Sequence, residues 1–172
     1  GMIKAGDDVI AYGFGGFNGV DYIIPSEFTA GDTGLGIPGG DTFQAGNFEV
    51  AGKKIALVNN FLVTIYDTEN QTSMTIPEDQ VRLLTSPSGQ ATEGTLQADG
   101  NLIIVRNDDS FTGNHAAFID VSGASPVVTA LANPTGDNEI NRIDHAVIDA
   151  TSRLAVGTAF VGGMDAFVVW NL

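Results

Sequence analysis

Residues 93–131 read EGTLQADGNLIIVRNDDSFTGNHAAFIDVSGASPVVTAL, and this stretch decides the fold. It holds four short apolar runs separated by residues typical of turns: EGTLQA, NLIIVR, AAFIDV and VVTAL. Runs of this length, rich in Val, Ile and Phe and bounded by Gly, Asn, Asp and Ser, are typical of β-strands. Asp99 and Gly100, between the first two runs, predict a two-residue type I′ hairpin turn. The stretch therefore predicts one small four-stranded sheet.

The same pattern of a turn followed by an apolar strand occurs four times along the chain. The first core apolar residues of these strands are Val9, Ile55, Leu102 and Leu154, spaced 46, 47 and 52 residues apart. A unit of this length is the size of one four-stranded propeller blade. One small sheet exposes both of its faces, and stacking several sheets buries them. We expect an all-β fold in a single domain over residues 1–172, with approximate repeats at 2–30, 42–77, 93–131 and 144–172.

Four blade-like repeats predict a β-propeller that is small, partial or half of a ring. The fourth repeat has no outer strand, so we expect that Met2–Ala5 closes it, that two chains combine, or that the chain is part of a longer propeller. Residues 28–46 are rich in glycine and predict a long loop. A β-sandwich of about ten strands is the alternative fold, because it gives the same alternation. Residues 77–84 and 138–147 also fit short helices, although the repeat favours a strand in the second.

The composition excludes several classes of function. The chain of 172 residues carries 7 basic and 21 acidic side chains, a net charge of −14, so a nucleic-acid partner is not expected. There is no cysteine, which excludes disulfides, thiolate metal sites and cysteine nucleophiles. No apolar run approaches the length of a membrane span, and no signal peptide is visible. We expect a soluble protein with no membrane partner, and a secreted or periplasmic location stays open.

Two stretches resemble a known kind of repeat. IDVSGASPVVTAL, from Ile119, looks like the segment joining the third and outer strands of propeller repeats of the LVIVD and YVTN type. IYDTENQTSMTIP, from Ile65, is similar to the same segment. The resemblance implies a β-propeller fold, and these motifs specify no activity.

The candidate site residues are acidic groups and one histidine at expected strand ends. Glu93, Asp144 and His145 fall where inner strands begin, so in a propeller they would lie at one end of the central channel. Asp108 and Asp109 fall in an acidic turn, and oxygen-rich turns are the ligands that calcium prefers. We therefore take the first three as candidate binding residues and the last two as candidate calcium ligands. No catalytic residue is predicted.

Two classes of function remain open at this point. The first is a non-catalytic binding or scaffold module for a protein or carbohydrate, which residues 28–46 and 107–115 would recognise. The second is a calcium-dependent, metal-assisted hydrolase such as a lactonase-like enzyme, which needs carboxylates from several repeats to converge. We favour the binding module over the enzyme. Part of a larger propeller protein, or a homodimer that completes a propeller, is a further interpretation.

Overall fold

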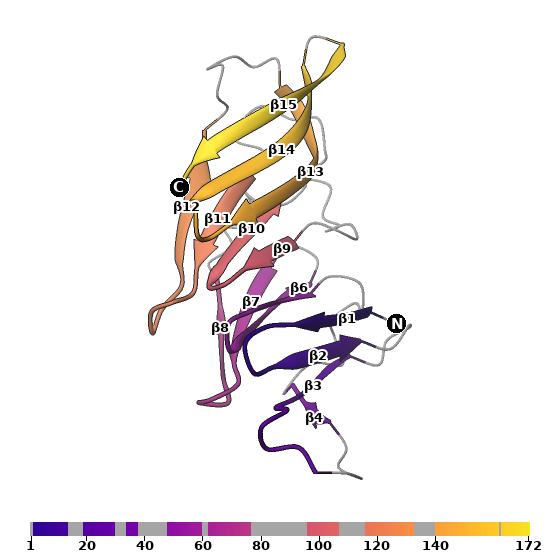
Figure 1. Ribbon diagram of the computed structural model, residues 1–172, viewed down its shortest axis with the longest axis vertical. Helices are drawn as coiled ribbons and strands as arrows, with labels where there is room; N and C mark the ends of the chain where they lie inside the picture. Colours follow the sequence, from indigo (N-terminus) through magenta and orange to yellow (C-terminus); the bar gives the residue numbers. More distant parts are fainter. Residues whose placement is uncertain are drawn as a thin grey trace.

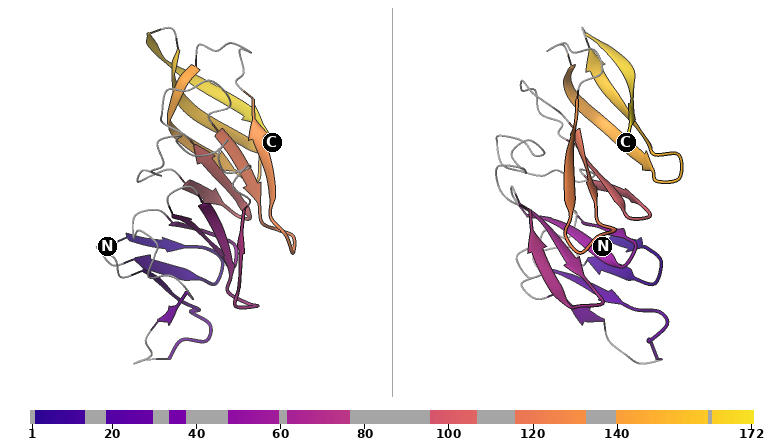
Figure 2. Two further views of the ribbon diagram at one scale, coloured as in Figure 1. Left: turned by 180° about the vertical axis from the view of Figure 1, so that it is seen from behind. Right: turned by 90° about the vertical axis from the view of Figure 1, so that its left-hand side faces the viewer.

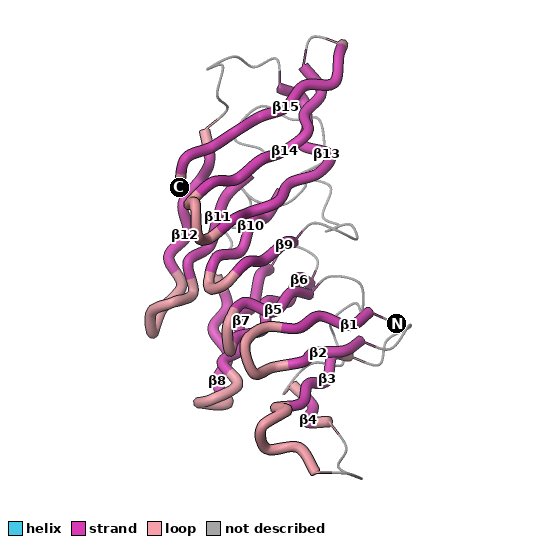
Figure 3. Tube along the Cα trace, viewed as in Figure 1, coloured by secondary structure: helices cyan, strands magenta, loops and turns pink. Residues whose placement is uncertain are grey.

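The computed structural model describes residues 2–13, 19–29, 34–37, 48–59, 62–76, 96–106, 116–132, 140–161 and 163–172. Within these ranges the chain forms strands, turns and loops but no helix (Figure 3). No helix in the described part is therefore long and apolar enough to cross a membrane. Residues 77–84, one of the two stretches that also fit a helix, lie outside the described ranges.

The strands form four separate antiparallel sheets that follow one another in the sequence. Sheet 1 contains β1 (Met2–Ala5), β2 (Ile10–Gly13), β3 (Val20–Ile23) and β4 (Leu35–Gly36). Sheet 2 contains β5 (Phe48–Ala51), β6 (Lys54–Asn59), β7 (Leu62–Asp67) and β8 (Thr72–Thr75). Sheet 3 contains β9 (Leu96–Asp99), β10 (Leu102–Arg106), β11 (Ala116–Asp120) and β12 (Val127–Leu131). Sheet 4 contains β13 (Ile140–Asp149), β14 (Leu154–Val161) and β15 (Met164–Asn171).

The four sheets stack face to face in chain order along the longest axis of the molecule (Figure 1). The first strands β1, β5, β9 and β13 lie next to one another in succession. Sheet 1 and sheet 4 lie at opposite ends of the stack, as the two further views also show (Figure 2). The described residues thus form an all-β stack of four sheets, and not the two facing sheets of a β-sandwich.

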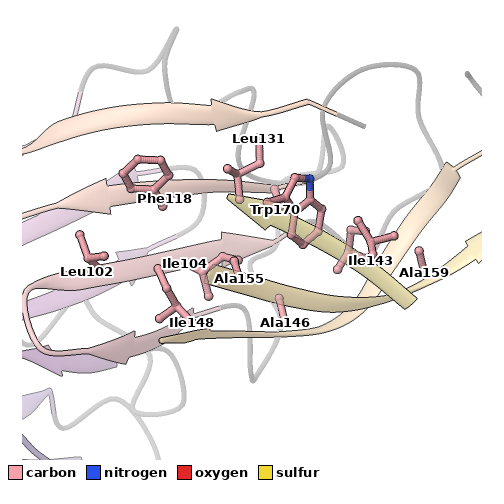
Figure 4. Packing of buried hydrophobic residues seen from close by; sticks show 12 residues of the cluster. Leu102, Ile104, Phe118, Leu131, Ile143, Ala146, Ile148, Ala155, Ala159 and Trp170 are labelled. Atoms are coloured by element: carbon pink, nitrogen blue, oxygen red, sulfur yellow. The ribbon is translucent and has the colours of Figure 1, made fainter. Parts of the chain in front are cut away.

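Each junction between two sheets encloses its own hydrophobic core. Sheets 1 and 2 bury one cluster that includes Tyr22 and Leu57, and sheets 2 and 3 bury another that includes Ile65 and Ile119. The third cluster, between sheets 3 and 4, surrounds Trp170 (Figure 4). A sheet whose two faces are both covered must be apolar on both, which is why LIIVR of β10 is buried at every position.

The tight turns after the first strands lie together at one end of the stack, which we call the turn end. A side-chain carbon at Gly52 would clash with Oδ1 of Asn101, in the corresponding turn of the next sheet. Gly52 also has a φ of +57°. Both this backbone conformation and the lack of space for a side chain therefore favour glycine at the position. In the third junction the amide of Ala150 donates to Oδ2 of Asp99 at 2.7 Å. The second strands β2, β6, β10 and β14 end at the opposite end, which we call the connection end.

Three sequence-based expectations need correction. The turn between β9 and β10 consists of Gly100 and Asn101, because Asp99 pairs with Leu102, and only Gly100 has a positive φ. This is the φ pattern of a type II′ turn and not of type I′. Met2–Ala5 is the first strand of sheet 1 and pairs with β2, so it does not close sheet 4. Leu35 and Gly36, inside the expected loop 28–46, form the short strand β4.

The expected strand near residue 144 is confirmed, and it is longer than the repeat indicates. β13 covers Ile140–Asp149, so this segment is a strand and not the helix that its apolar spacing also fits. Two register shifts, between Ile140 and Arg142 and between Ile143 and His145, bend the strand. Such β-bulges re-aim side chains at the ends of sheets.

Candidate functional site

A cavity of about 490 Å³ lies at the connection end of sheets 3 and 4. Its lining residues are Arg106, Asp144, His145, Thr158 and Asp165. They come from the end of β10, the middle of β13, the later part of β14 and the start of β15. One guanidinium, one imidazole, one hydroxyl and two carboxylates thus share a single opening.

The β-bulge in β13 decides how Asp144 and His145 present their side chains. Ile143 pairs with Ala159 and His145 pairs with Thr158, so Asp144 is the extra residue. Ile143 is fully buried, whereas Asp144 is half-buried and His145 is exposed. The bulge therefore lets two consecutive polar residues line the cavity while the strand keeps its apolar contacts on the other face.

Arg106 is the buried cation of the site. It is 8% exposed, and its Nη1 donates to the backbone carbonyl of Ile143 at 3.1 Å. A buried charge is tolerated only when hydrogen bonds or opposite charges satisfy it. Arg106 therefore ties β10 to β13 just where the bulge begins, and it fixes the floor of the cavity.

Two of the five lining residues were predicted from the sequence as binding residues, and three were not. Asp144 and His145 both line the cavity. Arg106, Thr158 and Asp165 were missed because each reads as an ordinary strand residue. One signal was available for Arg106, since it is the only charged residue in the run LIIVR.

Three predicted site residues lie outside the described ranges. They are Glu93, Asp108 and Asp109. Among the residues that are described, no group of three His, Asp or Glu side chains is close enough to hold a metal ion. Asp144, His145 and Asp165 line one cavity without forming such a group.

A second cavity of about 380 Å³ lies at the turn end, between sheets 1 and 2. Three of its charged residues, Asp8, Lys53 and Glu69, already form hydrogen bonds or an ion pair. Lys53 donates to Glu69 at 2.6 Å, and Asp8 accepts hydrogen bonds from the amide and hydroxyl of Ser26. The contact with Glu69 raises the pKa of Lys53. These contacts give the second cavity a structural role in joining the turns.

Buried polar contacts also join sheets 1 and 2. Lys4 of β1 forms an ion pair with Glu49 of β5, and Glu49 is buried. Burial raises the pKa of the Glu49 carboxyl, and the hydrogen bond and charge of Lys4 offset only part of that effect. The hydroxyls of Tyr22 and Tyr66 lie 3.2 Å apart, and burial together with this contact raises the pKa of Tyr22. Sheet 1 thus joins sheet 2 through polar as well as apolar contacts.

Comparison with known proteins gives a likeness of fold only. No protein-family model matches the sequence, and no curated protein matches it. Among solved structures, 99% of the chain superposes on 21% of a chain in the structure of PorZ, an essential bacterial surface component of the type-IX secretion system of Porphyromonas gingivalis. The TM-score is 0.53 and the sequence identity is 9%. The chain thus spans about a fifth of the length of that chain.

A second similar structure is a chain in a Saccharomyces cerevisiae complex of dbp5 with nup159, gle1, ip6 and adp. The match covers 98% of this chain and 46% of that one, with a TM-score of 0.44 and 9% identity.

Proposed function

We propose that the four sheets are consecutive blades of a β-propeller. Three features support this interpretation: every complete sheet has the same strand order, neighbouring sheets pack face to face, and the first strands lie side by side. The two stretches that resemble LVIVD and YVTN repeats correspond to the third strand, turn and fourth strand of sheets 3 and 2. A propeller with more than four blades would need further sheets of this kind in addition to the four described here.

The function we propose for the chain is a non-catalytic binding module whose ligand occupies the cavity at the connection end. The observation that carries this proposal is the convergence of Asp144, His145 and Asp165 with the buried Arg106. Carboxylates accept hydrogen bonds from hydroxyl and amide groups, and imidazole can donate or accept. A concave site with several such groups suits a polar ligand, either a carbohydrate or a polar stretch of protein.

A binding experiment on the intact chain tests this proposal. Labelled protein is applied to an array of oligosaccharides and to an array of peptides, and each hit is titrated in solution. We expect Asp144→Ala and Asp165→Ala to weaken binding by about tenfold or more, because each removes a charged acceptor. Glu27→Gln, at the second cavity, is the matched control and should bind as the unaltered chain does. Equal binding by all variants, or no hit on either array, contradicts the proposal.

The alternative function is a calcium-dependent hydrolase. Calcium binding distinguishes this enzyme from a non-catalytic binding module. Calorimetric titration with CaCl₂ should give no heat of binding if the site is a plain polar cavity. Binding that is lost in Asp108→Asn and Asp109→Asn together would favour the metal-dependent enzyme.

The third interpretation is a segment of a larger propeller protein, and the comparison with PorZ favours it over the enzyme. That likeness covers about a fifth of the PorZ chain. PorZ is a surface component of a secretion system, so a role at the bacterial surface is the proposal that this likeness suggests. Accessibility of the protein to externally added protease in intact cells tests it.

A further inference from the structure

Gly157 lies in the middle of β14 and pairs with Ala146 of β13. Its φ is not positive, so the backbone conformation at this position does not require glycine. The adjacent residues on the same face of β14, Ala155 and Ala159, are buried and carry a methyl group. The sheet therefore accommodates a methyl group on either side of Gly157, and the absence of one at this residue has a local cause.

A side-chain carbon at residue 157 would meet three neighbours at once. It would lie 3.1 Å from the carbonyl oxygen of His145, 3.1 Å from Cζ3 of Trp170 and 3.2 Å from Cγ2 of Ile143. Contacts this short would force the neighbours to move by a few tenths of an ångström. Two of the three, Ile143 and His145, flank Asp144, the extra residue of the β-bulge. Glycine within a strand often marks a bulge, and here it leaves the space that the bulge in β13 occupies.

Arg106 of sheet 3 holds the other end of the same bulge. It is buried, and its Nη1 donates to the carbonyl oxygen of Ile143 at 3.1 Å. The carbonyl group before Asp144 is thus placed by Arg106, and the one after it lies against the bare backbone of Gly157. A backbone that is fixed on both sides of a residue restricts where the side chains of that segment point. These two contacts therefore set how Asp144 and His145 line the cavity.

We infer that Gly157 is a positioning residue for the cavity at the connection end, although it is not one of the lining residues. The inference rests on the proposed function, because it concerns how that cavity binds a ligand. A methyl group at residue 157 would push the His145 carbonyl, and with it the bulge, away from β14. Binding groups are effective only when they are held within about 0.5 Å of the required geometry. Displacement of Asp144 and His145 would therefore weaken binding.

The first measurement compares crystal structures of the unaltered chain and of Gly157→Ala. We expect the His145 carbonyl to lie further from β14 in the variant by a few tenths of an ångström or more, and the side chains of Asp144 and His145 to be displaced with it. Gly123→Ala is the matched control, because an added carbon there would lie 3.6 Å from the carbonyl oxygen of Ser125, an ordinary contact. An unmoved bulge in Gly157→Ala would overturn the inference, whether or not a ligand has been identified.

Binding is measured second, with the oligosaccharides and peptides that the arrays select as probes. Gly157→Ala should bind them about threefold or more weakly than the unaltered chain, whereas Gly123→Ala should bind them equally well. Weaker binding by Asp144→Ala together with unchanged binding by Gly157→Ala would overturn this inference and leave the cavity proposal standing. Unchanged binding by Asp144→Ala would instead contradict the cavity proposal, and the crystal structures would still test the role of Gly157.

A double variant separates positioning of the bulge from packing against Trp170. Trp170→Phe removes Cζ3 but leaves the carbonyl of His145 in place, so it relieves only one of the close contacts at residue 157. In the Trp170→Phe background, Gly157→Ala should cost less stability than in the unaltered chain but should still weaken binding of the same probes by about threefold or more. Equal binding with and without Gly157→Ala in that background would show that the glycine only makes room for the indole ring, which would overturn the inference.

Discussion

Val169 and Trp170 are neighbours in β15, yet they lie in opposite surroundings. Trp170 points into the cluster between sheets 3 and 4, where Leu131 and Ile143 lie close to it (Figure 4). Its indole Nε1 donates to the carbonyl of Ala132 at 2.9 Å. Val169 points to the other face, which no described sheet covers. The comparison teaches that burial in this chain depends on the neighbouring sheet and not on residue type.

Trp170→Ala should give the largest loss of stability. The change removes a buried indole and its hydrogen bond, so we expect the free energy of unfolding to fall by about 3–5 kcal/mol. Val169→Ala should cost below about 1 kcal/mol, since the side chain of Val169 is exposed. Urea denaturation followed by fluorescence or circular dichroism gives both values. Similar losses for the two variants would mean that the two faces do not differ as described.

Gly157→Ala in β14 tests how closely the covered face of sheet 4 is packed. An added carbon would lie 3.1 Å from the carbonyl oxygen of His145 and 3.1 Å from Cζ3 of Trp170. Both neighbours are held in place, so we expect overpacking to cost about 1–3 kcal/mol in thermal or urea denaturation. Thr158→Ala, one residue along β14 and on the other face, is the control and should change stability by less than half as much.

Gln71→Gly should stabilise the chain slightly. Gln71 closes the turn between β7 and β8 with a φ of +53°, a conformation that costs a side-chain-bearing residue more than it costs glycine. We expect a gain of about 0.5 kcal/mol, because the higher flexibility of unfolded glycine offsets part of the relief. Asp67 accepts hydrogen bonds from the amides of Glu69 and Asn70 and keeps the turn formed in both variants. A loss of stability would show that the turn relies on the Gln71 side chain.

The buried Glu49 should make the junction between sheets 1 and 2 respond to pH. Burial raises the pKa of Glu49, so the folded chain holds this proton more tightly than the unfolded chain. The Glu49 contribution to stability therefore falls as pH rises from the ordinary glutamate pKa of 4.5 through the raised value. Glu49→Gln removes that fall and should flatten the curve of stability above pH 4.5, measured by urea denaturation at a series of pH values. Glu69→Gln, at an exposed ion pair, is the control, and identical curves for Glu49→Gln and the unaltered chain would contradict the assignment.

Local sequence patterns were sufficient to predict the strands and how they group into sheets. Short apolar runs between Gly, Asn and Asp turns specify strands locally, so the ends of β9–β12 fall within a few residues of the runs in 93–131. The spacing of Val9, Ile55, Leu102 and Leu154 likewise indicated four sheets, since each of these residues lies within one position of the first residue of a second strand. The same local signals predicted the wrong two residues for the turn between β9 and β10. The run LIIVR is buried at every position, so its hydrophobic pattern does not fix the register of the hairpin to within one residue.

The tertiary structure alone decided which faces are covered and where polar side chains meet. Side chains alternate between the two faces of a β-strand, so Val169 and Trp170 of β15 must point in opposite directions. This alternation does not indicate which of the two residues is buried by another sheet. Arg106 and Asp165 lie 59 residues apart in the sequence and share a cavity only because sheet 4 packs on sheet 3. Strands and turns depend on residues that are close in the sequence. The candidate site depends instead on packing between sheets, which brings together side chains from distant parts of the chain.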